Sequence, residues 1–152
     1  MFQSGDSCLL LVEDDSNDIL LIQKAFENTN VGNDVRIVKD GDAAIAYLCG
    51  EGQYADRNKY PLPVLILLDL KLPRRSGKEV LAWIRQQPGI KRIPVIVLTS
   101  SSQHADVDFS YDLGVNSYLV KPVGFEKLSE MIAAVDAYWL RLNEYPSVVL
   151  AE

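Results

Sequence analysis

The sequence predicts a single α/β domain, built on a five-stranded parallel sheet with helices on both faces. Two observations lead to this prediction. First, five short apolar runs alternate with segments whose apolar residues recur at helical spacing, which is typical of parallel sheets. Second, several runs are rich in Val, Ile and Leu without alternation, as expected of strands buried on both faces. The length of 152 residues and the hydrophobic fraction of 48% fit one compact domain.

The predicted strands and helices follow one another in strict order. The strands are Cys8–Val12, Val35–Val38, Val64–Leu68, Val95–Leu98 and Tyr118–Val120. The helices are expected around Ile19–Phe26, Ala43–Leu48, Val80–Ile84, Gln103–Leu113 and Leu128–Leu142. Ser16 is the predicted N-cap of the first helix. The fourth helix is weakly amphipathic, whereas the fifth has one apolar stripe over about four turns.

Composition excludes several classes of function. The net charge of −6 argues against nonspecific nucleic-acid binding, because there is no basic surplus to displace phosphate counterions. No apolar run reaches about 18 residues, so no membrane span is predicted. Met1–Ser7 is polar and lacks the apolar core of a signal peptide. We therefore expect a cytoplasmic protein that binds neither nucleic acid nor membranes, with protein partners left open.

The cysteines and the single histidine give no sign of a metal site. Cys8 and Cys49 belong to no CxxC pair and stand far from a histidine, so both are expected to be small buried hydrophobic residues. His104 stands among polar residues at a predicted helix start, where we expect a solvated side chain.

Polar residues follow four of the predicted strands, at the edge where ligands bind in an open α/β sheet. They are Glu13, Asp14 and Asp15 after the first strand, Asp69 and Lys71 after the third, Thr99 and Ser100–Ser102 after the fourth, and Lys121 after the fifth. Clustered carboxylates repel one another and need a cation, and oxygen ligands completed by water suit Mg²⁺. A carboxylate can also form an aspartyl phosphate, with a lysine and a hydroxyl stabilising the transferring group.

Each of these residues has an ordinary structural explanation when it is taken alone. Asp15 fits a helix cap, and Thr99 fits a strand-end residue with a satisfied hydroxyl. Lys121 fits a surface lysine, and Tyr118 fits half-buried strand packing. The functional interpretation rests on finding all of these residue types at the ends of the right strands in the right order.

Four segments resemble the motifs of the response-regulator receiver family, in order and at its spacing. They are L-L-V-E-D-D, L-L-D-L-K-L-P-x-x-x-G, V-L-T-S and Y-L-V-K-P. The resemblance covers residues 8–143 and implies a flavodoxin-like doubly wound (βα)5 three-layer sandwich with strand order 2-1-3-4-5. It divides the chain into a receiver domain over residues 6–143 and a C-terminal tail over residues 144–152.

The resemblance implies a phosphoacceptor switch that assists its own phosphorylation, rather than an enzyme. Asp69 matches the phosphoacceptor. Asp14 matches a direct metal ligand, and Glu13 matches a ligand that acts through water. The backbone carbonyl of Lys71 supplies a further ligand. The implied metal is Mg²⁺, for which Mn²⁺ can substitute.

Three further positions carry roles that the resemblance implies. Thr99 is the hydroxyl that bonds the phosphoryl group, and Lys121 is the cation paired with that group. Tyr118 is the aromatic residue that turns inward on activation. The bond between Lys121 and Pro122 resembles a cis peptide of the family, which would aim the lysine into the site.

The implied partner is a sensor histidine kinase or a hybrid kinase. The loop Glu51–Pro63 and the segments S-Y-D-L-G-V-N-S-Y and Y-W-L-R-L-N-E-Y-P resemble the subgroup of free-standing regulators paired with cyanobacterial phytochromes, which makes a bacteriophytochrome the implied kinase. Asn143 and Glu144 depart from the more apolar residues of that subgroup. No second domain is expected, so output through another protein, onward phosphotransfer and titration of the kinase all stay open.

Alternative functions meet specific obstacles. A phosphatase of the haloacid-dehalogenase type needs an aspartate two positions after the nucleophile, and a Toprim-type enzyme needs the same Asp-x-Asp, but Lys71 stands there. A dinucleotide enzyme needs a glycine-rich turn where Glu13 and Asp14 stand. A pseudo-receiver that only binds partners would lack the acceptor, the threonine or the lysine, and all three are present.

The fifth predicted helix is longer than the sheet beneath it. A helix of about 18 residues spans roughly 27 Å, whereas a five-residue strand spans about 17 Å. Tyr138, Trp139 and Leu142 lie in the overhang, and Tyr145 and Val148–Leu150 follow. Either the tail folds back over the sheet edge, or a homodimer buries the fifth helix and the tail against a second copy of the chain.

Overall fold

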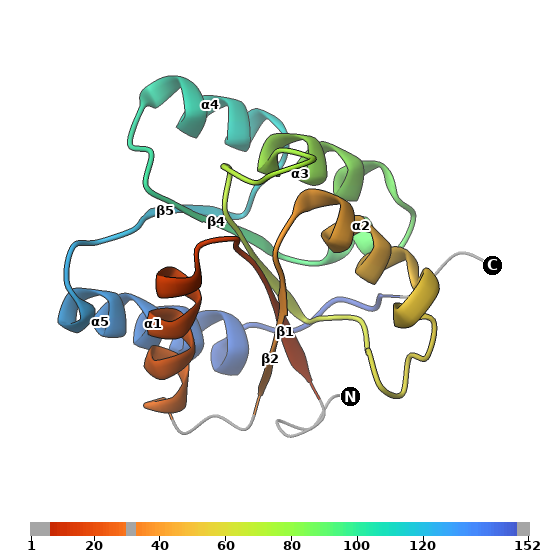
Figure 1. The fold of residues 1–152 in the computed structure, drawn as a ribbon, viewed down its shortest axis with the longest axis horizontal. Helices are drawn as coiled ribbons and strands as arrows, with labels where there is room; N and C mark the ends of the chain where they lie inside the picture. Colours follow the sequence, from red (N-terminus) through yellow and green to blue (C-terminus); the bar gives the residue numbers. More distant parts are fainter. Residues whose placement is uncertain (1–6, 30–32, 149–152) are drawn as a thin grey trace.

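A computed structural model describes residues 7–29 and 33–148 of the chain. Five parallel strands form one sheet in the order β2-β1-β3-β4-β5 (Figure 1), which confirms the predicted flavodoxin-like topology. The strands are β1 (Cys8–Val12), β2 (Asp34–Val38), β3 (Leu65–Leu68), β4 (Val95–Thr99) and β5 (Ser117–Val120). The α-helices are α1 (Ser16–Glu27), α2 (Gly41–Cys49), α3 (Gly77–Gln86), α4 (His104–Asp112) and α5 (Phe125–Val135). Two short 3-10 helices, η1 (Gly52–Tyr54) and η2 (Ile90–Arg92), and a π-helix, η3 (Asp136–Leu142), complete the described elements.

Two apolar clusters, one on each face of the sheet, form the core. Because side chains alternate along a strand, Leu9 and Leu11 face one cluster, whereas Leu10 and Val12 face the other. Helices α1 and α5 cover the first face, and α2 and α3 cover the second (Figure 1). Every residue of β1, β3 and β4 is buried, which explains the continuous apolar runs of these strands.

Helix α1 begins one residue earlier than predicted. The prediction that Ser16 is the N-cap is wrong, because Ser16 is already the first helical residue. Asp15 is the cap: its backbone is extended, and its Oδ1 accepts a hydrogen bond from the Asp18 N–H at 2.9 Å. The structural explanation of Asp15 as a helix cap is thus confirmed.

The two cysteines lie in different surroundings. Cys8 is buried in β1, as predicted. The prediction of a buried Cys49 is wrong, because its side chain is exposed. Helix α2 turns Tyr47 and Leu48 toward the sheet, and Cys49 lies about 100° further round the helix. His104 is exposed at the first residue of α4, as expected.

The long loop between α2 and β3 is organised around one arginine. Arg57 donates hydrogen bonds to the carbonyls of Tyr47 and Leu48, each at 2.7 Å. These carbonyls lie at the end of α2, where backbone acceptors lack helical partners. The rings of Tyr47, Tyr54 and Tyr60 pack beside the arginine with centroids 5.1 to 6.1 Å apart. The predicted polar loop therefore has a defined conformation.

The prediction of one continuous fifth α-helix is wrong in its last part, where the chain forms the π-helix η3. Residues five apart lie together in a π-helix. Accordingly, Arg141 Nε donates to Asp136 Oδ2 at 3.0 Å. The wider turn shifts the apolar face, so Leu140 is buried while Tyr138 and Leu142 are 55% and 75% exposed. Among the described residues, no helix combines the length and the apolarity needed to cross a bilayer.

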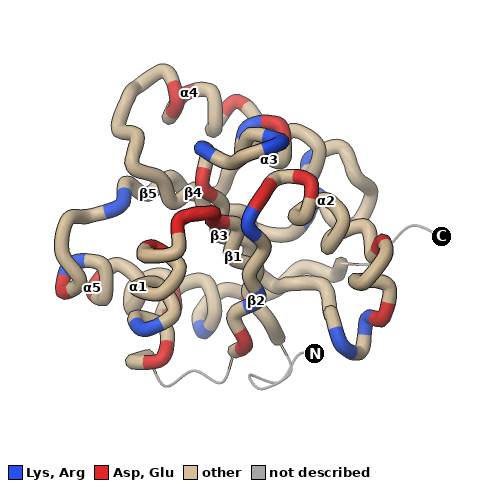
Figure 2. The backbone as a smooth tube through the Cα atoms, in the orientation of Figure 1, with Lys and Arg blue, Asp and Glu red and all other residues tan. Residues whose placement is uncertain are grey.

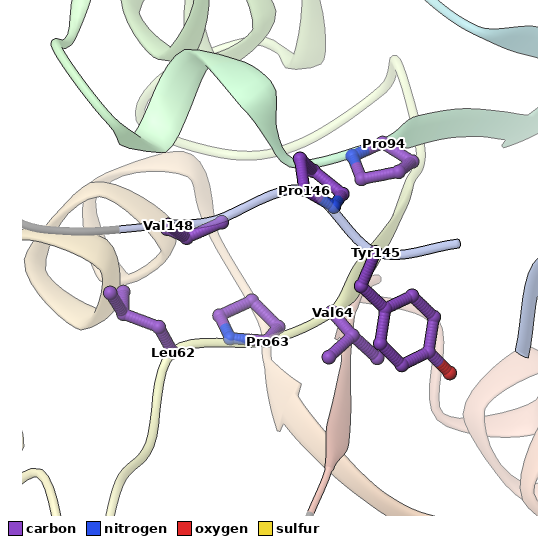
Figure 3. A pocket seen from close by; sticks show the side chains of 7 residues that line it. All are labelled: Leu62, Pro63, Val64, Pro94, Tyr145, Pro146 and Val148. Carbon is purple, nitrogen blue, oxygen red and sulfur yellow. The ribbon is translucent and has the colours of Figure 1, made fainter. Parts of the chain in front are cut away.

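The C-terminal tail folds back over the amino ends of β3 and β4 (Figure 3). Tyr145 packs against the core cluster beneath α1 and α5, and Val148 packs against the cluster on the opposite face. Both residues line a small apolar pocket with Pro63 and Pro94. The alternative in which the tail covers its own sheet is therefore confirmed as far as Val148. The rest of the predicted apolar tail, residues 149–150, lies outside the described residues.

Candidate functional site

The predicted site residues meet at the carboxyl ends of four strands. Glu13 follows β1, Asp69 follows β3, Thr99 ends β4 and Lys121 follows β5. Figure 2 shows acidic residues gathered where β1 leads into α1. The strand order reverses between β1 and β3, and the crevice at such a reversal is where open α/β sheets bind ligands.

Asp69 lies at the centre of the site. Its Oδ1 accepts hydrogen bonds from the Thr99 hydroxyl at 2.8 Å and from the backbone N–H of Lys71 at 3.2 Å. Its Oδ2 lies 3.0 Å from the Lys121 ammonium. Because donors reach both oxygens, the carboxylate is held in one orientation.

Gly77, the first residue of α3, lies directly against the backbone of Asp69. A Cβ at this position would lie well inside contact distance of the Asp69 carbonyl oxygen and of the Leu70 Cα. The Gly77 N–H donates to the Leu70 carbonyl at 2.9 Å. The absence of a side chain therefore lets α3 start immediately beneath the central carboxylate.

The Lys121 ammonium is surrounded by three carboxylates. Its Nζ lies 2.5 Å from Glu13 Oε1, 2.9 Å from Asp18 Oδ2 and 3.0 Å from Asp69 Oδ2. Burial lowers the pKa of Lys121, but the hydrogen bonds to these three carboxylates more than reverse that effect. The pKa of Lys121 is therefore raised, and the lysine stays charged.

The peptide bond that follows this lysine differs from the expectation. The prediction of a cis bond between Lys121 and Pro122 is wrong, since the described residues contain no cis peptide. The trans form is the lower in energy for most bonds to proline. In this chain the trans bond already brings the ammonium to Asp69, so the site does not need the cis form to aim the lysine.

Glu13 is the most deeply buried acid of the site, with 1% of its surface exposed. Its Oε2 accepts hydrogen bonds from the N–H groups of Asp14 and Asp15 at 3.0 and 3.1 Å. Burial raises the pKa of Glu13 to about 7; the hydrogen bond from Lys121 opposes this shift, and the negative charge of Asp69 adds to it. A cation beside Glu13 would favour its ionised form.

Three carboxylates of the site are placed to hold a divalent cation. Ligand oxygens of Glu13, Asp14 and Asp69 all lie within 4.8 Å of one another. Glu13 and Asp69 are buried and Asp14 is exposed, so the group is open to water on one side. Hard oxygen donors with room for water fit Mg²⁺ or Mn²⁺. The backbone carbonyl of Lys71 as a further ligand stays a prediction.

Tyr118 lies outside this cluster. Its ring is half-buried on β5, and its hydroxyl donates to the Ser101 carbonyl at 2.9 Å. Ser101 belongs to the loop that follows Thr99, so the tyrosine contacts the loop rather than the carboxylates. Its role as a switch residue stays a prediction.

Two polar groups beside the site were not predicted from the sequence. Asp18 binds Lys121 across 103 positions of the chain. Asp106 accepts hydrogen bonds from Lys78 at 2.7 Å and from the Ser101 hydroxyl at 2.5 Å. An acid one turn after the Glu13-Asp14-Asp15 run was the available signal for Asp18, but spacing alone does not identify so distant a partner.

The site combines the groups that phosphoryl transfer to a carboxylate requires. The Asp69 carboxylate is of a type that can act as a nucleophile, and the ammonium of Lys121 places a positive charge 3.0 Å from it. The Thr99 hydroxyl supplies a donor on the other oxygen. A cation on the acidic group would neutralise further negative charge.

Comparison with known proteins agrees with this geometry. The family model for the response regulator receiver domain matches residues 9–133 of this chain. Response regulator Rcp1 of Synechocystis sp. is 42% identical over 139 residues, which cover 91% of this chain and 92% of that protein. The crystal structure of the phosphorylated cyanobacterial phytochrome response regulator RcpA is 44% identical with a TM-score of 0.87, covering 93% of this chain and 99% of that one. The Mn²⁺-bound form of Rcp1 is 42% identical with a TM-score of 0.85 over the same shares. The chain therefore belongs to the response regulator receiver domain family.

Proposed function

We propose that this response regulator accepts a phosphoryl group on Asp69 from the phosphohistidine of a sensor histidine kinase or a hybrid kinase. The observation that carries the proposal is the pair of donors on the two Asp69 oxygens, the Thr99 hydroxyl at 2.8 Å and the Lys121 ammonium at 3.0 Å. Both donors stabilise charge that develops on a transferring phosphoryl group. The similar protein RcpA was solved in a phosphorylated form, which supports the same chemistry here.

In the proposed transfer, an Asp69 oxygen attacks phosphorus while the bond from phosphorus to the kinase imidazole nitrogen breaks. The electron pair of that bond stays on the imidazole. Lys121 and Thr99 then donate to phosphoryl oxygens in place of the free carboxylate. Water later attacks the phosphorus of the acyl phosphate, which releases inorganic phosphate and restores the Asp69 carboxylate. The protein thus assists its own phosphorylation and dephosphorylation, as a phosphoacceptor switch.

The proposed metal is Mg²⁺, with Mn²⁺ able to substitute. Glu13, Asp14 and Asp69, with the Lys71 carbonyl, would hold it, and when bound it supplies positive charge next to the phosphoryl oxygens. The Mn²⁺-bound form of Rcp1 supports a divalent site of this kind. We expect EDTA to abolish phosphorylation and calorimetry to register weak Mg²⁺ binding that Asp14→Ala removes, since few protein ligands serve the ion. Phosphorylation that continues undiminished in EDTA would contradict the proposal.

The proposed output is a change of surface that phosphorylation drives. The phosphoryl group draws in the Thr99 hydroxyl, and the ring of Tyr118 fills the space that Thr99 vacates. At present the half-buried ring of Tyr118 is held by a 2.9 Å hydrogen bond from its hydroxyl to the Ser101 carbonyl, so the loop after β4 is directly coupled to this residue. The surface formed by α4, β5 and α5 then changes its preference for partners.

The proposed kinase partner is a phytochrome-type sensor. RcpA is described as a cyanobacterial phytochrome response regulator, and further similar structures are bacteriophytochrome response regulators, among them one that is 45% identical. Phosphotransfer from a panel of purified, phosphorylated kinases is the direct test. We expect a phytochrome kinase to transfer its label fastest, and equal rates from unrelated kinases would contradict the assignment.

We also propose a homodimer that forms through η3 and the adjoining tail. Tyr138 and Leu142 remain 55% and 75% exposed although the tail is folded back, so an apolar surface is left at the end of the fifth helix. Point variants are the cleanest test, because truncation would also remove the tail from the core. We expect wild-type protein to scatter light as a dimer and Leu142→Ser to shift it toward monomer. A monomeric wild type at tens of micromolar would contradict the dimer.

The central experiment replaces the acceptor. Asp69→Asn is nearly isosteric and removes repulsion among the acids, so we expect a folded protein of equal or greater stability that takes no phosphoryl group. Intact mass measured after incubation with acetyl phosphate and Mg²⁺ detects the acyl phosphate directly. An acyl phosphate that persists in this variant would show that Asp69 is not the acceptor.

A further inference from the structure

One partner of the Lys121 ammonium lies outside the cluster of acids at the strand ends. The three N–H donors of the lysine have three acidic acceptors, Glu13 at 2.5 Å, Asp18 at 2.9 Å and Asp69 at 3.0 Å. Glu13 and Asp69 follow strands, whereas Asp18 lies in the first turn of α1. The chemistry proposed above uses Glu13 and Asp69 but gives Asp18 no task.

The start of α1 holds Asp18 in place. Its backbone N–H donates to the side chain of Asp15, the helix cap, at 2.9 Å. The positive end of the helix dipole favours a carboxylate in the first turn. Ile22, one turn further on, is buried against the sheet and fixes the helix there. Asp18 is therefore a carboxylate on a rigid support, with 36% of its side chain exposed to water.

The other two acceptors of Lys121 have competing uses. Glu13 and Asp69 belong to the group whose oxygens lie within 4.8 Å of one another, and Asp18 is not part of that group. A cation bound by this group partly neutralises the negative charge of Glu13 and Asp69, so the attraction of these two carboxylates for Lys121 weakens. A lysine has a long side chain with many rotamers, and it loses its fixed position unless another acceptor holds it. Asp18 is that acceptor.

We infer that Asp18 is a positioning residue, which holds the Lys121 ammonium beside Asp69 for phosphoryl transfer. The inference rests on the proposed phosphorylation of Asp69. Asp18 acts through the lysine, since its carboxylate contacts the ammonium and not the reacting atoms. If Asp18 acted only through its charge, its removal would speed phosphorylation, because a negative charge near the site repels an anionic donor. Loss of the anchor slows phosphorylation.

A matched pair of variants distinguishes the anchoring role, which predicts slower phosphorylation, from the purely electrostatic role, which predicts faster phosphorylation. Asp18→Asn and Asp15→Asn each remove one negative charge from the start of α1, and asparagine caps helices about as well as aspartate. At saturating Mg²⁺ we expect the rate of phosphorylation by acetyl phosphate to fall about fivefold in Asp18→Asn, the effect of one modest hydrogen bond. In Asp15→Asn we expect an unchanged or higher rate. A rate in Asp18→Asn at or above that of wild type would overturn the inference.

A second measurement reports directly on the hydrogen bonds of the Lys121 ammonium. NMR of the Lys121 ammonium in metal-free, unphosphorylated protein reports how fast its N–H protons exchange with water. We expect faster exchange in Asp18→Asn than in wild type or in Asp15→Asn, because one acceptor has been weakened. This readout does not depend on phosphoryl transfer, so a protein that takes no phosphate would defeat the proposed function and still leave the role of Asp18 testable. Exchange that is equal in all three proteins would overturn that role.

Discussion

The central strands and the α4–β5 edge of this molecule are built in different ways. Every residue of β1, β3 and β4 is buried, and their side chains contribute to apolar clusters on both faces of the sheet. Along α4, by contrast, Ser110 is the buried residue, and β5 is only partly buried. The acidic group of Glu13, Asp14 and Asp69 follows strands of the first region, whereas Tyr118 belongs to the second.

Polar contacts, rather than apolar burial, hold α4 in place. Lys78 of α3 lies 2.7 Å from Asp106 and 5.0 Å from the centroid of the Phe109 ring. Asp106 in turn accepts a hydrogen bond from Ser101, whose carbonyl receives the Tyr118 hydroxyl. Such contacts exchange with water at low cost, whereas a packed core does not.

The difference between the regions suggests a division of labour. The proposed binding of a metal and a phosphoryl group needs side chains in fixed positions, and the buried strands provide these. The proposed response to phosphorylation needs a segment that rearranges at low cost, and the α4–β5 edge has the contacts of such a segment. The predictions below test this division, starting with the largest expected effect.

The first prediction compares matched truncations in the two regions. Leu67→Ala removes a fully buried side chain of β3, and we expect the free energy of unfolding to fall by about 2 to 5 kcal/mol. Phe109→Ala removes a side chain of α4 that is about half exposed, and we expect a loss of about 1 kcal/mol or less. Urea unfolding measures both values. Equal losses would remove the proposed distinction.

The second prediction concerns Arg85, which ties α3 to the edge. Its guanidinium donates to the Gly114 carbonyl and to Asn116 Oδ1, each at 2.8 Å, beyond the end of α4. We expect Arg85→Met, which keeps most of the stem, to cost about 1 to 2 kcal/mol, because acceptors that water can also reach lose a charged donor. Hydrogen exchange should quicken most around residues 110–118. Faster exchange spread evenly over β1 and β3 would speak against a local anchor.

The third prediction uses pH to probe the buried side of the site. Burial raises the pKa of Glu13 from its ordinary value near 4.5 to about 7, so the folded protein binds this proton more tightly than the unfolded chain. The resulting stability is fully present below about pH 4.5 and is lost as pH rises through about 7. In metal-free buffer we expect the free energy of unfolding to decline over this range, and Glu13→Gln to flatten the decline. If the free energy of unfolding depended on pH identically in wild type and in Glu13→Gln, the raised pKa of Glu13 would be refuted.

The smallest expected effect is that of Asp106→Asn. Hydrogen bonds from Lys78, and then from Ser101, lower the pKa of Asp106 from its ordinary value of 3.8. The contribution of Asp106 to the free energy of unfolding is therefore present above this pH and is lost as pH falls below it. This pH dependence is opposite in direction to that of Glu13. At pH 7 we expect faster hydrogen exchange in α4 and unchanged exchange in β3. A matching change in β3 would mean that the edge and the core open together.

Much of the fold could be predicted from the sequence, because burial on both faces gives a strand a continuous apolar run. The five strands were predicted to within a residue or so of their observed ends, and the family motifs supplied the strand order. Glu13, Asp69, Thr99 and Lys121 were predicted to converge, since parallel strands end at one edge of the sheet.

The features that were missed or left open depend on contacts that periodicity does not encode. The apolar stripe after Val135 fits an α-helix, but the contact of Asp136 with Arg141 accompanies a π-turn. Two courses of the tail were left open, and the observed one depends on a surface made by Pro63 and Pro94, which lie far away in the sequence. The pairing of Asp18 with Lys121 is likewise a product of tertiary structure.

Gly77 has a consequence for how the chain tolerates mutation. Any side chain at this position meets the carbonyl of Asp69, and the backbone at Asp69 is tied to β1 because the Asp69 N–H donates to the Val12 carbonyl at 3.0 Å. A Cβ on Gly52, in contrast, would meet no atom within 4 Å, although its φ of +56° strains most side chains. A saturation library scored for phosphorylation should therefore retain glycine alone at position 77 and admit asparagine at position 52.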